Sequence, residues 1–330
     1  MKNTVLTLVT GATGNLGNSV VRELVKNNRN VRCLVRDINK SSQILPSSVE
    51  IVHGDLTDEK SIQKAMKGVK SVFHAGGLPE QWFKDESIFE KVNTLGTKYL
   101  IESALKEKVT RFIYTSTQDV FDLTQNEFDE TTRNPEISCS AYERSKILAQ
   151  QLIDKAVIEE GLPAISLHPV AIYGPVISKP TGMTRLIDEL INNKIPVLLK
   201  GGFPIVFNQD AAKAHILAEQ KSTIGEKYIL TDDYYTLNEI TIKVNQIYPS
   251  AKVPKLMPDF IATLIASIGE PISKLTGKPS LITKSELKVL RRKGRPNGMK
   301  IRKKLGWKTT PFQKGLKQTI DSLQNTNKRE

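Results

Sequence analysis

Short hydrophobic runs alternate with longer amphipathic stretches through the first half of the chain. The runs lack a clean in-and-out alternation, which is typical of strands buried on both faces of a parallel sheet. We expect strands at Thr4–Val9, Val31–Val35, Val49–His53, Ser71–His74, Arg111–Tyr114 and Ala164–His168. Helices are expected between them at Asn15–Asn28, Glu59–Lys67, Phe89–Lys106 and Tyr142–Glu160. This alternation predicts an α/β fold with a doubly wound parallel sheet.

The pattern changes near Gly174-Pro175, where prolines become frequent and expected helices outnumber expected strands. The helices are predicted at Thr184–Asn193, Gln209–Ser222, Leu237–Ile247, Phe260–Leu275, Lys284–Arg292 and Pro311–Leu323. We interpret residues 1–175 as one domain and residues 176–330 as a smaller, mostly helical lobe, with a partial return of the chain to the first domain around residues 203–222. The cleft between them would lie at the carboxyl ends of the strands, where open α/β sheets bind ligands.

Composition narrows the class of protein. The chain has 330 residues, of which 39% are hydrophobic and 25% charged, so it can bury a core. Its net charge of +13 favours a phosphate-bearing partner, which can be a nucleotide, a nucleic acid or an anionic membrane. Cys33 and Cys139 form neither a disulfide framework nor a metal-binding pattern, and no signal peptide is visible, so we expect a cytoplasmic protein without a metal site. The apolar stretch Phe260–Ile268 is too short to span a bilayer.

A glycine-rich loop follows the first expected strand, with the sequence Thr10-Gly11-Ala12-Thr13-Gly14-Asn15-Leu16-Gly17. Gly11 would permit the tight turn, Gly14 would let the backbone approach a pyrophosphate, and Gly17 would let the next helix pack closely on the strand. The start of that helix offers free N–H groups and the positive end of its dipole. A strand before the loop and a helix after it are the context that dinucleotide binding requires. The expected fold is therefore a Rossmann doubly wound sheet.

The ends of the second and third strands bear on which dinucleotide is bound. Arg36 follows the second strand and can pair with the 2′-phosphate of NADP, which favours NADP over NAD. The alternative is that Arg36 is solvated and Asp37 holds the ribose hydroxyl of NAD. Asp55, in Gly54-Asp55-Leu56, is either a carboxylate near the adenine or a simple helix cap.

Tyr142 and Lys146 are four residues apart at the start of an expected helix, so both side chains point from one face. A tyrosine is a poor acid–base group at neutral pH, and a neighbouring lysine cation would lower its pKa. Tyr142 could then exchange a proton with a carbonyl or alcohol oxygen. The pairing is common on helix surfaces and gains weight only from other segments. Hydroxyl groups at Tyr114–Thr117 would reach the same sheet edge, and Asn93 adds an amide early in the preceding long helix.

Together these segments resemble the extended short-chain dehydrogenase/reductases, the superfamily of sugar-nucleotide epimerases, 3β-hydroxysteroid dehydrogenases and dihydroflavonol reductases. The matching segments follow the family order over residues 4–220: Thr10–Gly17, Gly54–Leu56, Val72–Ala75, Asn93–Thr97, Tyr114–Thr117, Tyr142–Lys146, His168–Pro175 and Asn208–Asp210. The second strand, Val31–Asp37, is most similar to dihydroflavonol-reductase-like members. The weaker tail match, which includes Ile272–Leu281 and Lys303–Trp307, resembles farnesol-dehydrogenase-like and hydroxysteroid-dehydrogenase-like members.

The resemblance implies roles for individual residues. Thr117, Tyr142 and Lys146 would form the catalytic triad, with Ser116 as the rival of Thr117, and Asn93 would support the lysine. The residues implied at the cofactor, besides Tyr142 and Lys146, are Gly11, Thr13, Gly14, Asn15, Leu16, Gly17, Arg36, Asp55, Leu56, Ala75 and Pro169. A homodimer through the Phe89–Lys106 and Tyr142–Glu160 helices is also implied.

The chain departs from two branches of the superfamily. Dehydratases carry an Asp-Glu pair directly after the catalytic threonine, whereas Gln118 and Asp119 follow Thr117 here. Epimerases usually carry an acidic residue after strand two, where this chain has Arg36. We therefore expect an NAD(P)-dependent oxidoreductase acting on a mid-sized apolar ketone, aldehyde or secondary alcohol. A sugar-nucleotide epimerase with tightly held NAD is the alternative.

Several remaining features permit two interpretations. Trp82 and Phe83 either line a substrate pocket or pack in the core, and Phe260–Ile268 is core, a substrate tunnel or a membrane-docking patch. The basic run from Arg291 to Lys304 is interpreted as a solvated face; the second interpretation is a binding site for an anionic substrate or a lipid surface. Nucleic acid is not expected because no aromatic platform accompanies the charges. Histidines on or beside buried strands are interpreted as structural.

Overall fold

A parallel sheet of seven strands forms the centre of the computed structural model, which describes residues 5–134, 140–176, 179–276 and 282–327. The strand order is β3-β2-β1-β4-β5-β7-β11, and every neighbouring pair is parallel. The strands are β1 (Leu6–Thr10), β2 (Asn30–Val35), β3 (Glu50–His53), β4 (Ser71–His74), β5 (Arg111–Thr115), β7 (Ala164–Pro169) and β11 (Lys227–Leu230). The six predicted strands are confirmed, and β11 was not predicted. Thr4 and Cys139 lie outside the described residues.

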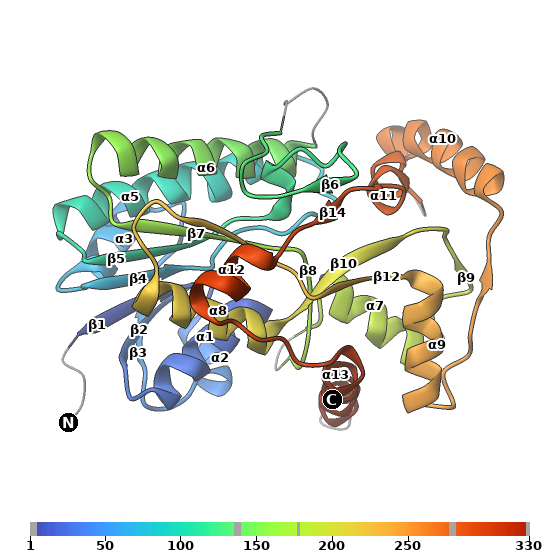
Figure 1. The fold of residues 1–330 in the computed structure, drawn as a ribbon, viewed down its shortest axis with the longest axis horizontal. Coiled ribbons are helices and arrows are strands. Elements are labelled where there is room, and N and C mark those ends of the chain that lie inside the picture. Colours follow the sequence, from blue (N-terminus) through green and yellow to red (C-terminus); the bar gives the residue numbers. More distant parts are fainter. Residues whose placement is uncertain (1–4, 135–139, 177–178, 277–281, 328–330) are drawn as a thin grey trace.

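Helices cover both faces of this sheet (Figure 1). One face packs against α1 (Asn15–Lys26) and α8 (Asn208–Lys221), which contribute Val20, Leu24 and Ala214 to the core. The other face packs against α3 (Glu59–Met66), α5 (Gly96–Lys106) and α6 (Ala141–Glu159). The side chains of β1, β4 and β5 alternate between these two cores, which is why their sequences read as continuous hydrophobic runs. The predicted α/β fold with a doubly wound Rossmann sheet is confirmed.

The second half of the chain builds three small sheets that the hydrophobic pattern did not predict. They join β8 (Ala171–Tyr173), β10 (Gly202–Phe207) and β12 (Asp233–Thr236); β9 (Val197–Leu198) and β13 (Lys255–Leu256); and β6 (Glu127–Phe128) and β14 (Arg295–Pro296). The helices are α7 (Gly182–Ile191), α9 (Leu237–Ile247), α10 (Asp259–Thr276), α11 (Lys284–Leu290), α12 (Met299–Leu305) and α13 (Phe312–Asn327). A core around Tyr173, Ile187, Phe207 and Leu316 holds part of this region together.

The helices differ from the predicted ones at two places in the first half of the chain. The expected helix at Phe89–Lys106 begins as α4 (Ser87–Phe89), continues through a π-helical turn at Glu90–Leu95 and ends as α5. The short helix α2 (Ile38–Ile44) was not predicted; the carboxylate of Asp37 caps it by accepting a hydrogen bond from the backbone N–H of Lys40. The division of the chain at residue 175 stays a prediction.

Candidate active site

The glycine-rich loop lies where β1 meets α1, and its geometry requires glycine at two positions. Gly11 has a φ of +70°, and a Cβ there would come within 2.6 Å of the carbonyl oxygen of Ala75. A Cβ on Gly17 would overlap the carbonyl oxygen of Gly11. Gly14 is exposed at the start of α1, and no side chain caps the helix there. This cradle fits the pyrophosphate of a dinucleotide, because the backbone can approach closely and the helix end is open.

The side chain of Asn15 joins this loop to the second half of the chain. Its amide nitrogen donates to Thr184 on α7, and its amide oxygen accepts from Asn208 at the start of α8. Asn208 also donates to the carbonyl oxygen of Pro175 and is fully buried. A small pocket beside this network is lined by Thr13, Gly14, Asn15, Asn18, Ile44, Pro175 and Val176, whereas Leu16 is buried in the core. Because its amide oxygen and one amide N–H are engaged, Asn15 can offer phosphates its backbone N–H and the second proton of its amide nitrogen.

The neighbouring strand ends carry the other predicted cofactor residues. Arg36 is exposed after β2 and forms no hydrogen bond or ion pair with another described residue. The carboxylate of Asp37 caps α2. Asp55 accepts hydrogen bonds from the backbone and hydroxyl of Thr57, at 2.8 and 2.7 Å, while Asp58 is the residue that caps α3. Of the two interpretations of Asp55, the helix cap is therefore wrong.

Leu56 and Ala75 lie close to the glycine-rich loop. A Cβ added to Gly76 would come within 3.0 Å of Leu56 Cδ1, and the carbonyl oxygen of Ala75 faces Gly11. Pro169 is buried at the end of β7, where it pairs in register with Leu230 of β11. The predicted set is thus distributed along the carboxyl edge of one sheet.

Helix α6 begins one residue before the predicted catalytic tyrosine, and a capping box at Ser140 precedes it. The hydroxyl of Ser140 accepts from the backbone N–H of Glu143, and the carboxylate of Glu143 accepts from the backbone N–H of Ser140. This fixes the first turn, which carries Tyr142. The ring of Tyr142 packs edge-on against Phe89 with centroids 5.9 Å apart, and Phe83 packs against Phe89 in turn.

Lys146 lies one turn further along α6 and is buried. Its ammonium group donates to the carbonyl oxygen of Thr115 at 3.0 Å and lies 5.2 Å from the ring centre of Tyr114. Burial lowers the pKa of Lys146 to about 8, and the carboxylate of Asp119 acts in the opposite direction. With this pKa, Lys146 still carries its positive charge at neutral pH, which suits a group that stabilises a transient phenolate.

The pKa of Tyr142 departs from the simple expectation. Burial raises it, the negative charge of Asp119 raises it further, and a side-chain hydrogen bond with Thr117 acts in the opposite direction. The Lys146 cation, which we expected to lower this pKa, does not set its direction, because desolvation dominates. Tyr142 is therefore a neutral proton donor.

The hydroxyl groups of Thr117 and Ser116 differ in their hydrogen bonding. The hydroxyl of Thr117 donates to Asp119 Oδ2 at 2.7 Å and also acts on the pKa of Tyr142. The hydroxyl of Ser116 is buried and has no hydrogen-bond partner among the described residues. The arrangement favours Thr117 over Ser116 as the hydroxyl beside Tyr142.

Asn93 is buried in the π-helical turn and contacts α6 next to the lysine. Its amide donates to Ser145 Oγ at 3.0 Å, accepts from the backbone N–H of Leu78 at 2.7 Å and donates back to Leu78 O. None of these hydrogen bonds is to Lys146, whose ammonium donates to the carbonyl oxygen of Thr115. Any support that Asn93 gives Lys146 therefore passes through the adjacent Ser145 or through a bridging water.

Sequence reasoning missed the charged residues around Tyr142. Arg292, which follows α11, donates to Asp119 at 2.8 Å and to Glu143, and all three are mostly buried. We call Arg292, Asp119 and Glu143 the carboxylate clamp. Burial and the charges of Asp119 and Glu143 raise the pKa of nearby Glu80 to about 7. Arg292 is 173 residues from Asp119 in sequence, so no local pattern could have indicated the pairing.

The clamp also changes the interpretation of the basic run. Arg291 pairs with Asp259, Arg302 with Asp232, and both Lys300 and Lys304 with Glu226. Much of the run is therefore paired with acidic side chains rather than forming a purely solvated face. Its charges fasten the C-terminal segment to the rest of the protein.

Three buried histidines connect strands and helices near the site. His74 bonds Thr10 and Thr97 through its two ring nitrogens, His168 bonds the carbonyl oxygen of Thr117, and His215 bonds Thr115 and Ala211. Burial lowers the pKa of His74 and His168 to about 3 and that of His215 to about 4. These neutral, hydrogen-bonded rings have the character of structural histidines.

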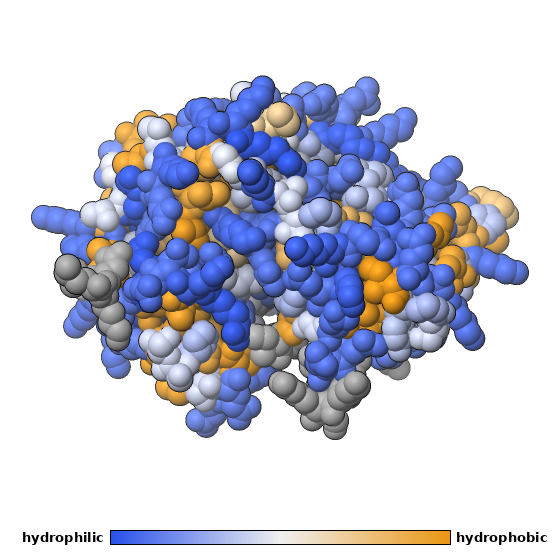
Figure 2. Space-filling model, turned by 60° about the horizontal axis from the view of Figure 1, so that its bottom comes forward, coloured by the Kyte–Doolittle hydropathy of each residue, from blue (hydrophilic) through white to orange (hydrophobic). Residues whose placement is uncertain are grey.

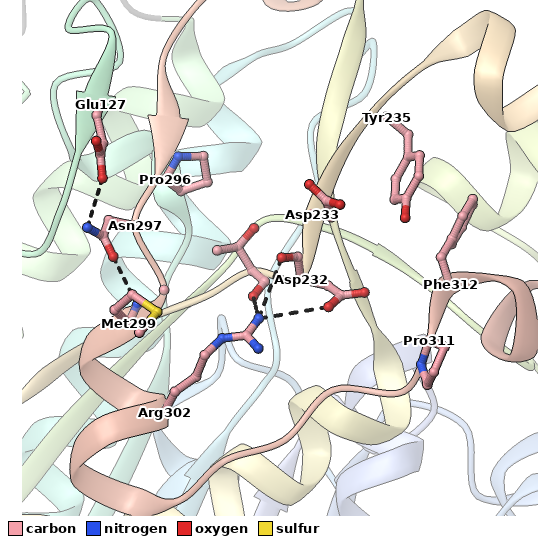
Figure 3. A pocket seen from close by; sticks show the side chains of 12 residues that line it. Glu127, Asp232, Asp233, Tyr235, Pro296, Asn297, Met299, Arg302, Pro311 and Phe312 are labelled. Atoms are coloured by element: carbon pink, nitrogen blue, oxygen red, sulfur yellow. Dashed lines mark hydrogen bonds and ion pairs between the residues drawn. The ribbon is translucent and has the colours of Figure 1, made fainter.

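A separate open groove lies at the carboxyl end of β11 (Figure 3). The guanidinium of Arg302 donates a hydrogen bond to the carbonyl oxygen of Thr231 in this groove, and the amide of Asn297 donates one to the carboxylate of Glu127. Tyr235 and Phe312 stack at its other side with ring centroids 4.3 Å apart. These contacts hold the C-terminal segment on the sheet, and the groove contains none of the predicted site residues.

In the part of the chain that the structure describes, no group of three or more His, Cys, Asp or Glu side chains could hold a metal ion. No helix within the described ranges is long and apolar enough to cross a membrane.

Comparison with known proteins agrees with this site. Residues 7–230 match the NAD dependent epimerase/dehydratase family. A putative dihydroflavonol 4-reductase of Synechocystis is 25% identical over 96% of this chain and 94% of that protein. A decarboxylating sterol-4-alpha-carboxylate 3-dehydrogenase of Candida albicans is 28% identical over 95% of this chain and 96% of that protein.

The solved structure of gox2253 has a TM-score of 0.85 and 31% identity, and the match covers 98% of each chain. The family match spans the glycine-rich loop, the Tyr142–Lys146 pair and all seven strands of the large sheet. The chain therefore belongs to the NAD dependent epimerase/dehydratase family, and it is an NAD(P)-dependent oxidoreductase of the extended short-chain dehydrogenase/reductase type.

Proposed function

We propose that the protein is a reductase or dehydrogenase that prefers NADP and acts on an apolar ketone, aldehyde or secondary alcohol. The observation that carries the proposal is the placement of Tyr142 at the start of α6, one helical turn from the buried Lys146 and near enough to Thr117 for that hydroxyl to act on its pKa. Thr117 and Lys146 meet at the carboxyl end of β5, because Lys146 donates to Thr115 there. Proton transfer and hydride transfer would therefore take place at one sheet edge.

The mechanism follows from these groups. The nicotinamide cofactor, when bound through Gly11, Gly14 and Gly17, supplies or accepts the hydride. In the reducing direction Tyr142 donates its phenolic proton to the carbonyl oxygen of the substrate. The Lys146 cation stabilises the phenolate that remains. The hydroxyl of Thr117 turns from Asp119 to the same oxygen and orients it. In the oxidising direction the phenolate takes the proton from the alcohol.

The charges around Tyr142 support an uncharged substrate. Glu80, Asp119 and Glu143 surround it, and the guanidinium of Arg292 already pairs with two of these carboxylates. The phosphates of a nucleotide sugar would meet repulsion here, and Arg292 is not free to offset it. The rings of Phe83 and Phe89 add an apolar wall on the Tyr142 side. The relatives named for a dihydroflavonol and a sterol-4-alpha-carboxylate agree with a polycyclic substrate, although the second name gives an acid rather than an uncharged compound.

The cofactor preference rests on Arg36 and Asp37. The exposed guanidinium of Arg36 follows β2, where the adenosine ribose lies in such folds, and it is available for a 2′-phosphate. Asp37, the residue that would hold an NAD ribose, already caps α2. Both placements favour NADP. The predicted homodimer and cytoplasmic location remain predictions.

The test follows deuterium from the 4-position of NADPH or NADH into product, read by mass spectrometry across apolar ketones, aldehydes and UDP-sugars. We expect label at a carbinol carbon of an apolar product, with NADPH the better donor. Interconversion of a UDP-sugar without label from added cofactor would replace the reductase by an epimerase that retains its cofactor.

A tyrosine variant tests the proposed acid in the same assay. Tyr142→Phe should lower kcat by about 10²–10⁴-fold because it removes general acid–base catalysis. NADPH binding, followed by fluorescence, should persist. Tyr99→Phe, on α5 and partly buried, is the control and should leave kcat unchanged. Full turnover by Tyr142→Phe would contradict the mechanism.

A further inference from the structure

Helix α10 exposes a stripe of large hydrophobic side chains. Phe260 is 73% exposed, Leu264 58%, Ile268 54% and Ile272 52%. The four residues are spaced four apart, so they lie along one side of the helix. We call them the apolar stripe. Figure 2 shows hydrophobic side chains gathered at the right-hand end of the molecule, the end that holds α9, α10 and β9 in Figure 1.

The opposite side of α10 is the one that packs on the protein. Ala262 and Ala266 are buried there against Ile282 and Leu287. A helix that packs in a core normally turns its large apolar residues inward. Here Ala262 and Ala266 are the fully buried positions and Ile265 packs beside them, while the four residues of the apolar stripe face outward. Exposed single hydrophobic residues are ordinary, but a stripe along a whole helix marks an interaction surface.

The chemistry around the stripe indicates the partner. Residues 252–295 contain ten lysine and arginine residues and only three acidic ones. Lys252 and Lys255 precede α10, and Lys284 and Lys288 lie on α11, which packs against it; all four are exposed. Arg291 also lies nearby, although it pairs with Asp259. An exposed apolar helix flanked by lysines fits a membrane surface that carries anionic lipid headgroups.

We propose that α10 docks on an anionic membrane surface, lying in its plane with the apolar stripe among the acyl chains near the headgroups. No helix of the described chain can span the bilayer, so the contact would be peripheral. The site lies close by in the chain, because α11 leads directly into Arg292 of the carboxylate clamp. If the proposed function holds, docking would place the active site beside a reservoir of apolar substrate.

The test is co-sedimentation of the full chain with phosphatidylcholine vesicles, with and without phosphatidylglycerol. We expect binding to the anionic vesicles that weakens as salt rises. Phe260→Ser combined with Leu264→Ser should reduce binding about tenfold or more, because it removes two inserted side chains. Lys284→Glu combined with Lys288→Glu should reduce it as well. Ile158→Ser combined with Ile224→Ser, which changes exposed isoleucines away from α10, is the matched control.

Thermal unfolding and size-exclusion chromatography with light scattering would accompany each variant. Failure of the unaltered protein to bind anionic vesicles, or equal binding by the stripe variant, would overturn the proposal. A change from dimer to monomer in the stripe variant, without vesicle binding, would instead make the stripe an interface between copies of this chain. Vesicle binding needs no turnover, so it can succeed even if the proposed reductase activity fails.

Discussion

Arg292 is the residue on which the electrostatics of the site depend most. It pairs with Asp119 and Glu143, and these residues adjoin Thr117 and Tyr142. One guanidinium therefore connects the two backbone segments that carry the proposed proton-transfer groups. Removing it would leave two mostly buried carboxylates unpaired beside the proposed acid.

Replacing Arg292 with glutamine should therefore destabilise the protein and change its pH dependence. We expect a loss of about 3 kcal/mol in the free energy of unfolding, because breaking a buried ion pair leaves uncompensated charge. The unpaired carboxylates would raise the pKa of Tyr142 further, so alcohol oxidation would need a higher pH. Urea unfolding and the pH profile of kcat measure the two effects. Adding Asp119→Asn and Glu143→Gln should restore part of the stability; an unchanged unfolding free energy in Arg292→Gln would show that the clamp contributes nothing.

Arg36 gives a second prediction for a single residue. Arg36→Gln should weaken NADPH binding about 10–100-fold, because it removes a charge-assisted hydrogen bond to phosphate. NADH binding should change little, since NADH lacks the 2′-phosphate. Fluorescence titration with both cofactors gives the ratio, and Lys40→Gln on α2 is a nearby charge control. Equal losses for NADH and NADPH would assign Arg36 to a general structural role.

At the scale of elements, the fit of α1 on β1 depends on a single missing side chain. A Cβ on Gly17 would overlap the carbonyl oxygen of Gly11, so Gly17→Ala must push the helix away from the strand. We expect a loss of about 1–3 kcal/mol in unfolding free energy, as for other overpacked sites. NADPH binding should weaken too, because the cradle would open. Ser19→Ala, on the same helix, is the control in denaturation and cofactor titration; an unaffected Gly17→Ala would mean that the loop relaxes at little cost.

The elements differ in how far the sequence predicts them. The inner strands β1, β4 and β5 were predictable because both of their faces are buried and their hydrophobic runs are continuous, whereas β11 of the same sheet was missed. Helix α2 was missed because its seven residues, INKSSQI, contain only two hydrophobic positions. The short strands β6 and β14 have two residues each and pair across more than half of the chain, so no local pattern specifies them. The carboxylate clamp was missed for the same reason, because Arg292 lies far from Asp119 and Glu143 in the sequence. The glycine-rich loop and the Tyr142–Lys146 pair are local and were predictable.

For the whole molecule, the buried histidines set the response of stability to acid. The pKa values of His74 and His168 fall to about 3 and that of His215 to about 4, below the ordinary value of 6.5. The unfolded chain therefore binds protons first as pH drops. Their contribution to stability is present above about pH 6.5 and is lost as pH falls toward the folded pKa values. At pH 5 the loss is about 2 kcal/mol for each histidine.

The carboxyl of Glu80 acts against this trend, because its pKa is raised to about 7 and its protonation favours the folded state over the same range. Although part of the Glu80 side chain is desolvated against the carboxylate clamp, the residue keeps a large contact with water, so solvent screening reduces its effect, whereas the three histidines are fully buried. We therefore expect the thermal unfolding midpoint to decrease as the pH is lowered from about 7.5 to about 5. His215→Gln should be less stable at pH 7.5 but lose less stability on acidification than the unaltered protein. A midpoint independent of pH over that range would mean that these rings become protonated without unfolding, and hence that their burial is not maintained in solution.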